Sequence, residues 1–243
     1  MEPIPGWCQL RMSFFYQSML KYLILIVSLI AFNSNAQTPL ISEVELFGGP
    51  SLSNYWGKDR PMDQVANFTY FFGGGVSHRF KNKLEINVKF LFERKGNKMD
   101  YVETLYDKND VPSDYRFIQG SKLDYLTLLT NLKYYIDQKD RFYAGLGCYV
   151  SNLRKSATYT EMQSLDTGAT IYYYYQYVDI HNDFDFGLSV TTGYRIQLRT
   201  KLNLNIQLTS SVGLLDIVNN DIPTEASTRC FNLLLGVGFT FKP

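Results

Sequence analysis

The stretch KLDYLTLLTNLKYYIDQKDRFYAGLGCYVSN, from Lys122 to Asn152, decides the fold of this chain. It holds two long runs of alternating apolar and polar side chains, and the polar segment DQKD separates them. A period of two is typical of a β-strand, and two such runs around a short turn predict a hairpin. Each run exceeds the ~5–6 residues of a common soluble strand and reaches the ~9–11 that a tilted strand needs to cross a bilayer. The stretch therefore predicts one hairpin of a membrane barrel.

The same alternation recurs along the rest of the chain, without a long apolar run or a helical period after Ile41. The further segments are Glu43–Leu52, Asn67–Phe80, Leu84–Arg94, Asp183–Ile196, Lys201–Gly213 and Arg229–Phe241. Their connections alternate between long and short, as in a barrel with short periplasmic turns and long outer loops. We therefore expect an all-β fold, an eight-stranded antiparallel up-and-down transmembrane β-barrel.

Two connections are especially long. Gly96–Ser121 is rich in polar residues, and we expect a long polar loop there. The excursion from about Leu153 to Asn182 contains the turn segment LDTG between alternating arms. This second pattern predicts a hairpin that projects beyond the barrel.

The N-terminal region has the pattern of a secretory leader. A short apolar run follows Lys21, and the segment NSNAQ after it places small residues at −3 and −1 of a cleavage point. We expect cleavage between Ala36 and Gln37, so that residues 1–36 are leader and residues 37–243 form the outer-membrane barrel. A transmembrane anchor is the alternative, but the run is short and lacks positive charge on its right flank. The true start could also be Met12 or Met19.

Composition limits the classes of function. The net charge of +1 gives no sign of a nucleic-acid partner. A mean hydropathy of −0.17 excludes a polytopic helical membrane protein but fits a barrel, in which every second residue can be polar. The cysteines Cys8, Cys148 and Cys230 show no metal-binding spacing. We expect no disulfide framework, no metal and no cofactor.

The polar face of the strands decides between a soluble and a membrane barrel. A soluble ligand-binding barrel turns its polar face to water, and a membrane barrel turns it inward. Glycines recur on this face, where they would relieve crowding inside a narrow lumen but would only weaken a solvated strand. Charges of both signs share the face and predict a paired structural network in the lumen: Glu43, Glu45, Arg79, Glu85, Lys89, Glu93, Lys133, Asp185 and Arg195. The sequence therefore favours a membrane barrel over a soluble one.

The last strand carries an assembly signal. Gly236, Phe239 and Phe241 resemble the C-terminal pattern read by the barrel assembly machinery, a polar residue followed by glycine and two aromatic residues at fixed spacing. Leu234 occupies the polar position, which is a departure from that pattern. We expect the barrel assembly machinery and outer-membrane lipid to be partners.

The opening stretch also resembles the PorT-like outer-membrane β-barrel family of Bacteroidetes. Its motifs match at Tyr125, Leu126, Leu132, Lys133, Tyr134 and Tyr135, then at Arg141, Phe142, Tyr143, Gly145, Gly147 and Tyr149. The segments FDFGLSVTTGYRI and GVGFTF resemble the family too, as does the Asn-Ala-Gln end of the leader. The resemblance implies an eight-stranded, OmpA-like barrel in the outer membrane. It implies no single activity, since only some members act in type IX secretion.

Signs of chemistry are weak. His78 and His181 are the only histidines, and no Gly-x-Ser-x-Gly or HExxH motif occurs. Asp179-x-His181-x-Asp183 could bind a divalent metal, but a solvated loop fits better. A row of tyrosines in the long excursion could form an extracellular contact surface, an interfacial aromatic belt or a hairpin extension: Tyr172, Tyr173, Tyr174, Tyr175 and Tyr177.

Three functions remain open. The first is a non-enzymatic outer-membrane barrel with a structural, surface-interaction or envelope accessory role, which could include secretion. The second is a small pore, although a lumen filled by charged side chains should not conduct solutes. The third is a lipid-modifying membrane enzyme, for which no motif is present.

Overall fold

The alternating runs form strands in the structure, a computed structural model that describes residues 41–56, 64–80, 83–106, 110–175, 182–215, 217 and 227–240. The strands are β1 (Glu43–Trp56), β2 (Gln64–Val65), β3 (Asn67–Arg79), β4 (Leu84–Lys95), β5 (Lys98–Tyr106), β6 (Pro112–Tyr135), β7 (Phe142–Ser164), β8 (Thr170–Tyr175), β9 (Phe184–Arg199), β10 (Leu202–Gly213) and β11 (Ser227–Thr240). In these ranges, no helix is long and apolar enough to span a membrane. The expected leader and its cleavage point lie outside the described residues.

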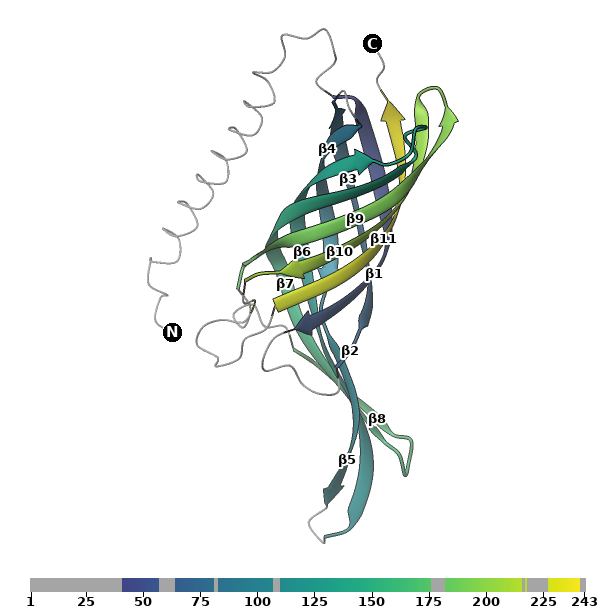
Figure 1. Cartoon of the computed structure of the whole chain (residues 1–243). Helices are drawn as coiled ribbons and strands as arrows, with labels where there is room; N and C mark the ends of the chain where they lie inside the picture. Colours follow the sequence, from purple (N-terminus) through teal and green to yellow (C-terminus); the bar gives the residue numbers. More distant parts are fainter. Residues whose placement is uncertain are drawn as a thin grey trace, which may run out of the picture. The chain divides into compact units, whose positions relative to one another are not determined.

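A ring of 8 strands closes the sheet on itself, in the order β1, β3, β4, β6, β7, β9, β10, β11 and back to β1 (Figure 1). Every neighbouring pair in the ring is antiparallel. The opening stretch supplies β6 and β7, which pair Leu132 with Leu146 and Tyr135 with Tyr143 across its short turn. The ring closes where β1 meets β11, with Glu43 opposite Thr240. The predicted eight-stranded antiparallel barrel is confirmed.

Two ring strands continue far beyond the barrel. β6 has 24 residues and β7 has 23, and they stay paired up to Tyr115 and Ser164. β5 pairs with the first part of β6, and β8 pairs with the last part of β7. We call this four-stranded extension the distal sheet: β5, residues 112–120 of β6, residues 158–164 of β7, and β8. It extends from the end of the barrel opposite the short turns (Figure 1).

The distal sheet confirms one prediction and corrects another. The LDTG segment forms the turn between β7 and β8, so the projecting hairpin is confirmed. The expectation of a polar loop over Gly96–Ser121 is wrong, because most of this segment belongs to β5 and β6. A strand with both faces outside the membrane has no need of a strict apolar alternation, so its charged residues hid the strand signal.

The barrel has apolar side chains outside and polar side chains inside. Leu46, Phe68 and Leu146 on the outer face are 67%, 72% and 68% exposed. Lys89 and Asn131 on the inner face are 0% exposed. A soluble barrel would have the reverse arrangement, so the outer face is suited to lipid.

Candidate functional site

The interior of the barrel is filled in three layers, which β4 displays in order along its inward face. From the short-turn end to the long-loop end, this row reads Glu85, Asn87, Lys89, Leu91, Glu93 and Lys95, and all are buried. Charged residues occupy the two ends of the row, and an apolar residue lies between them. The rest of the interior follows the same order.

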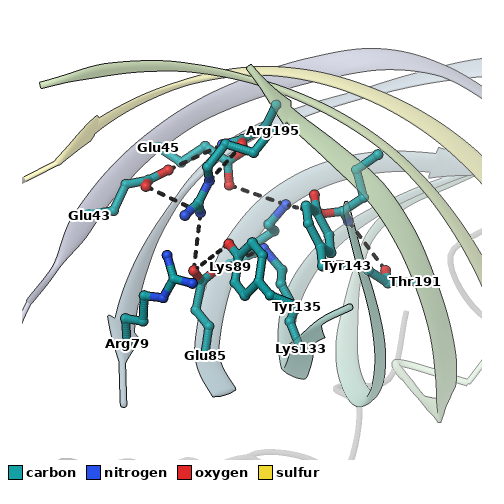
Figure 2. Close-up of polar contacts among 12 residues, drawn as sticks. Glu43, Glu45, Arg79, Glu85, Lys89, Lys133, Tyr135, Tyr143, Thr191 and Arg195 are labelled. Carbon is teal, nitrogen blue, oxygen red and sulfur yellow. Dashed lines mark hydrogen bonds and ion pairs between the residues drawn. The ribbon is translucent and has the colours of Figure 1, made fainter. Parts of the chain in front are cut away.

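Glu85 is the centre of the turn-end cluster (Figure 2). Its Oε1 lies 3.2 Å from Lys133 Nζ, and its Oε2 lies 3.1 Å from Arg195 Nη2. The hydroxyl of Tyr135 also donates to Oε2, at 2.7 Å. One buried carboxylate therefore compensates two cations, one from β6 and one from β9, which β7 separates in the ring.

Two further carboxylates extend this cluster along β1. Glu43 Oε2 lies 3.2 Å from Arg195 Nη2, so the guanidinium bridges Glu43 and Glu85. Glu45 Oε2 lies 3.3 Å from Lys89 Nζ. The amide of Asn205 donates to both Glu43 and Glu45, at 3.2 and 3.0 Å, which satisfies oxygens that the cations leave open.

An apolar belt crosses the middle of the lumen. Its members are Phe47, Phe71, Leu91, Leu129, Tyr149 and Leu234. The cavity beside the belt measures about 20 Å³. This is room for about one water molecule, so a hydrated ion does not fit.

The loop-end cluster lies beyond the belt and is built on Lys95. Its Nζ lies 2.9 Å from Asp185 Oδ2 and 3.1 Å from Glu93 Oε1. Hydroxyl groups complete the site, since Thr228 donates to Asp185 and Thr127 donates to Glu93, both at 2.6 Å. Next to this cluster, Ile217 is fully buried against Leu123 and Tyr125, and Leu123 lies opposite Lys95 in the register.

The structure places the residues of the predicted lumen network on the inward face of the ring. All its members but one lie inside the ring: Glu43, Glu45, Glu85, Lys89, Glu93, Lys133, Asp185 and Arg195. Arg79 lies at the turn-end rim of the same face, opposite Glu85 in the register. Its guanidinium is 4.3 Å from the centre of the Tyr135 ring, and its ion pair is with Asp140, at 2.9 Å from Nη2 to Oδ2. The sequence reasoning missed Lys95 because it ended the strand one residue early; continued alternation from Glu93 would have found it.

Glycines on the lumen face make room for large side chains from neighbouring strands. A Cβ added to Gly193 would collide with the ring of Tyr143 and the carbonyl of Ile206. A Cβ added to Gly187 would collide with Tyr149 and with the backbone of β10. Lumen glycines thus accommodate inward-pointing tyrosines, which in turn contact the buried lysines.

The tyrosine row does not form one surface. Residues of a strand point alternately to opposite faces, so Tyr172 and Tyr174 share one face of β8 and Tyr173 lies on the other. All three are exposed. Tyr175 ends β8, and Tyr177 lies outside the described residues.

The remaining candidates form no joint site among the residues that the structure describes. His78 contacts the edge of the Phe80 ring, with centroids 4.7 Å apart, while Asp179 and His181 lie outside the described residues. Cys148 and Cys230 are free thiols. Where the chain is described, no group of three or more His, Cys, Asp or Glu side chains could hold a metal ion. Gly236 faces Glu45 in the lumen, Phe239 points outward, and Phe241 is not among the described residues.

A closed antiparallel ring with an apolar exterior and charges inside defines an integral membrane β-barrel. The chain belongs to the family described as outer membrane protein beta-barrel domain, whose model matches residues 35–219. The family and the polarity of the barrel place it in the outer membrane, in contact with lipid. No curated protein matches the sequence.

Several solved barrels have a similar fold. Neisserial surface protein A is 12% identical, with 82% of this chain and 97% of that chain covered and a TM-score of 0.38. Ail, the attachment invasion locus protein of Yersinia pestis, is 9% identical, with 83% and 99% covered and a TM-score of 0.33. OprG from Pseudomonas aeruginosa is 12% identical, with 84% and 97% covered and a TM-score of 0.36. Likenesses this distant carry no argument about function.

Proposed function

We propose that the protein is a non-enzymatic, non-conducting outer-membrane barrel that presents its distal sheet to partners outside the membrane. The observation that carries this proposal is the filled lumen. Two charged clusters are separated by the apolar belt, and a second apolar cluster of Leu123, Tyr125 and Ile217 is buried at the loop end. A solute would have to break buried ion pairs and cross an apolar constriction, so the interior supports a structural role rather than the alternative of a small pore.

The distal sheet supports the second half of the proposal. β6 and β7 continue as paired strands well past the ring, and the two outer strands β5 and β8 widen this extension. Binding residues concentrate on the loops and extensions that a rigid scaffold holds in place. The barrel would be that scaffold, and the distal sheet its working surface.

Narrower roles follow from the resemblance to PorT-like barrels. A role as an accessory to envelope or secretion proteins is compatible with a closed barrel that displays a large sheet. Assembly through the C-terminal signal of Gly236, Phe239 and Phe241 would make the barrel assembly machinery a transient partner. A lipid-modifying enzyme is the least supported alternative, because the described interior holds its charges in mutual ion pairs and offers no paired nucleophile and histidine.

Surface labelling of intact cells tests the proposal. Tyr106 is 68% exposed at the end of β5, and Lys139 is exposed in the short turn between β6 and β7. In a Cys148→Ser background, a membrane-impermeant maleimide should label Tyr106→Cys on intact cells and label Lys139→Cys only after the outer membrane is opened. Labelling of Lys139→Cys but not Tyr106→Cys on intact cells would contradict the proposal.

A further inference from the structure

The distal sheet continues the two faces of β6 and β7 beyond the barrel, and the two faces differ in how their side chains are arranged. Ser121, Leu123 and Tyr125 of β6 point into the lumen and are buried. By alternation, Phe117 and Tyr115 continue this inner face beyond the barrel. The inner face of the distal sheet is therefore the continuation of the lumen face of β6.

Cross-strand register extends this inner face over all four strands. One row pairs Tyr101, Phe117, Met162 and Ile171, because directly opposite residues share a face. The rings of Tyr101 and Phe117 are stacked, with centroids 5.4 Å apart. Leu105, Ile171 and Tyr173 on this face are 37%, 46% and 44% exposed. β5 pairs only with β2 and β6, and β8 only with β7, among the described strands.

The opposite face satisfies its own polar groups. Arg116 donates two hydrogen bonds of 2.7 Å to the carboxylate of Asp100, and these bonds lower the pKa of Asp100. Thr104 donates to Asp114 at 2.6 Å. This face also exposes Val102, Tyr106, Tyr172 and Tyr174. The inner face differs from it by the continuous row of opposed apolar side chains and by a cavity, and a contiguous apolar surface of this kind marks an interaction site.

The inner face also contains a cavity of about 260 Å³ near the β7–β8 turn. Its lining combines the apolar or aromatic side chains of Tyr115, Met162, Ala169 and Ile171 with the polar side chains of Ser113, Ser164, Asp166 and Thr167. It is smaller than the ~300–1,000 Å³ of a typical small-molecule pocket. A single apolar side chain from a partner is a suitable occupant, as in the pockets that anchor hot-spot residues.

The charged side chains of the inner face are acidic. Glu103 lies opposite Tyr115 in the register, and Asp166 lines the cavity. No Lys or Arg shares this face in the register of the described strands. Electrostatic complementarity therefore favours a partner with a basic side chain next to its apolar one.

We propose that the inner face of the distal sheet docks a segment of a protein partner that carries an apolar anchor side chain with a Lys or Arg beside it. The anchor enters the cavity lined by Met162 and Ile171, and the basic side chain meets Asp166 or Glu103. This inference rests on the proposed function, since the sheet must be accessible outside the membrane.

Site-specific cross-linking in cells of the native host tests this proposal. A photo-crosslinking amino acid in place of Ile171 should form an adduct with another protein, and the same amino acid in place of Thr170 on the opposite face should not. Mass spectrometry of the adduct should identify a segment with an apolar residue next to Lys or Arg. A synthetic peptide of that segment should bind the purified full-length barrel, and Glu103→Lys with Asp166→Lys should weaken binding about tenfold or more.

The controls separate this proposal from its alternatives. Glu161→Lys, on the opposite face, should leave peptide binding unchanged, and heat-modifiable gel migration confirms that each variant is folded. An adduct between two copies of this chain, an adduct with lipid or glycan, or no adduct at Ile171 would overturn the proposal. If Tyr106→Cys is labelled on intact cells and Ile171 still yields no protein adduct, the docking inference fails while the proposed function stands.

Discussion

Replacement of Glu85 by glutamine should destabilise the barrel more than any exposed charge change. Lys133 has a side-chain exposure of 2%, and Glu85 is the carboxylate that pairs with it at 3.2 Å. Glu85→Gln leaves this ammonium buried without its counter-charge and also weakens the bridge to Arg195. Breaking one side of a buried pair costs about 3–5 kcal/mol. That is a large share of the ~5–15 kcal/mol that stabilises a typical protein.

Replacement of the partner, Lys133, should cost less stability than replacement of Glu85, because the two residues have different numbers of other partners. Lys133→Met removes one cation, but Glu85 keeps Arg195 at 3.1 Å and the Tyr135 hydroxyl at 2.7 Å. We expect a loss of about 1–3 kcal/mol. The double variant should cost less than the sum of the singles by about 0.5–3 kcal/mol, since each change removes the partner that the other leaves unsatisfied.

Urea unfolding of the barrel in lipid vesicles measures these costs. Folded and unfolded fractions follow from heat-modifiable migration, and midpoint shifts convert to free energy through the slope of the transition. Lys139→Met in the exposed turn is the matched control and should change stability by less than about 0.5 kcal/mol. A cost below about 1 kcal/mol for Glu85→Gln, or full additivity in the double variant, would refute the claim that the lumen charges form a coupled network.

Three other predictions concern glycine, the turn and the leader. Gly193→Val should prevent folding because its side chain would collide with Tyr143, while Gly74→Ala on the lipid face should fold normally; gel migration after refolding distinguishes them. Desolvation raises the pKa of Asp137, but two backbone N–H donors at 2.7 and 3.0 Å outweigh it and lower the net pKa. The stabilising contribution of Asp137 is therefore present above the unfolded pKa of about 3.9 and is lost as pH falls through the lower folded value. Asp137→Ala should make the stability of the barrel fall less steeply in acid. Urea unfolding at several pH values measures this. The mature protein should begin directly after Ala36, and N-terminal sequencing of outer-membrane material that begins elsewhere would contradict this.

The ring could be predicted from the sequence because lipid imposes a strict pattern on its strands. Most lipid-facing residues are apolar and most lumen positions are polar or small, so the alternation in runs such as Lys201–Gly213 is clear. Outside the membrane this constraint ends. β5 and the first part of β6 lie outside the membrane, so neither face must be strictly apolar. Their charged residues therefore predicted a loop, although the two strands pair over the full length of β5.

The lumen network could be predicted in membership but not in its pairing. The alternation of side chains along each strand places Glu85, Lys133 and Arg195 on the inward face. Only the closure of the ring brings the side chains from β4, β6 and β9 within contact distance of one another. The apolar belt was not predicted. The alternation along each strand places Phe47, Leu91 and Leu129 on the inward face. Each strand has only a few such apolar residues among many polar ones, so the belt becomes recognisable only when the strands are aligned in register.

Conductance of the purified protein in planar lipid bilayers tests the central claim most directly. The lumen is closed by the belt around Leu91 and Leu234 and by two charged clusters, and the cavity beside the belt is about 20 Å³. The folded barrel should therefore insert without any conductance step above the lipid baseline, in salt solutions at either polarity. Steady, long-lived conductance steps from protein shown to be folded by gel migration would contradict the closed-lumen account.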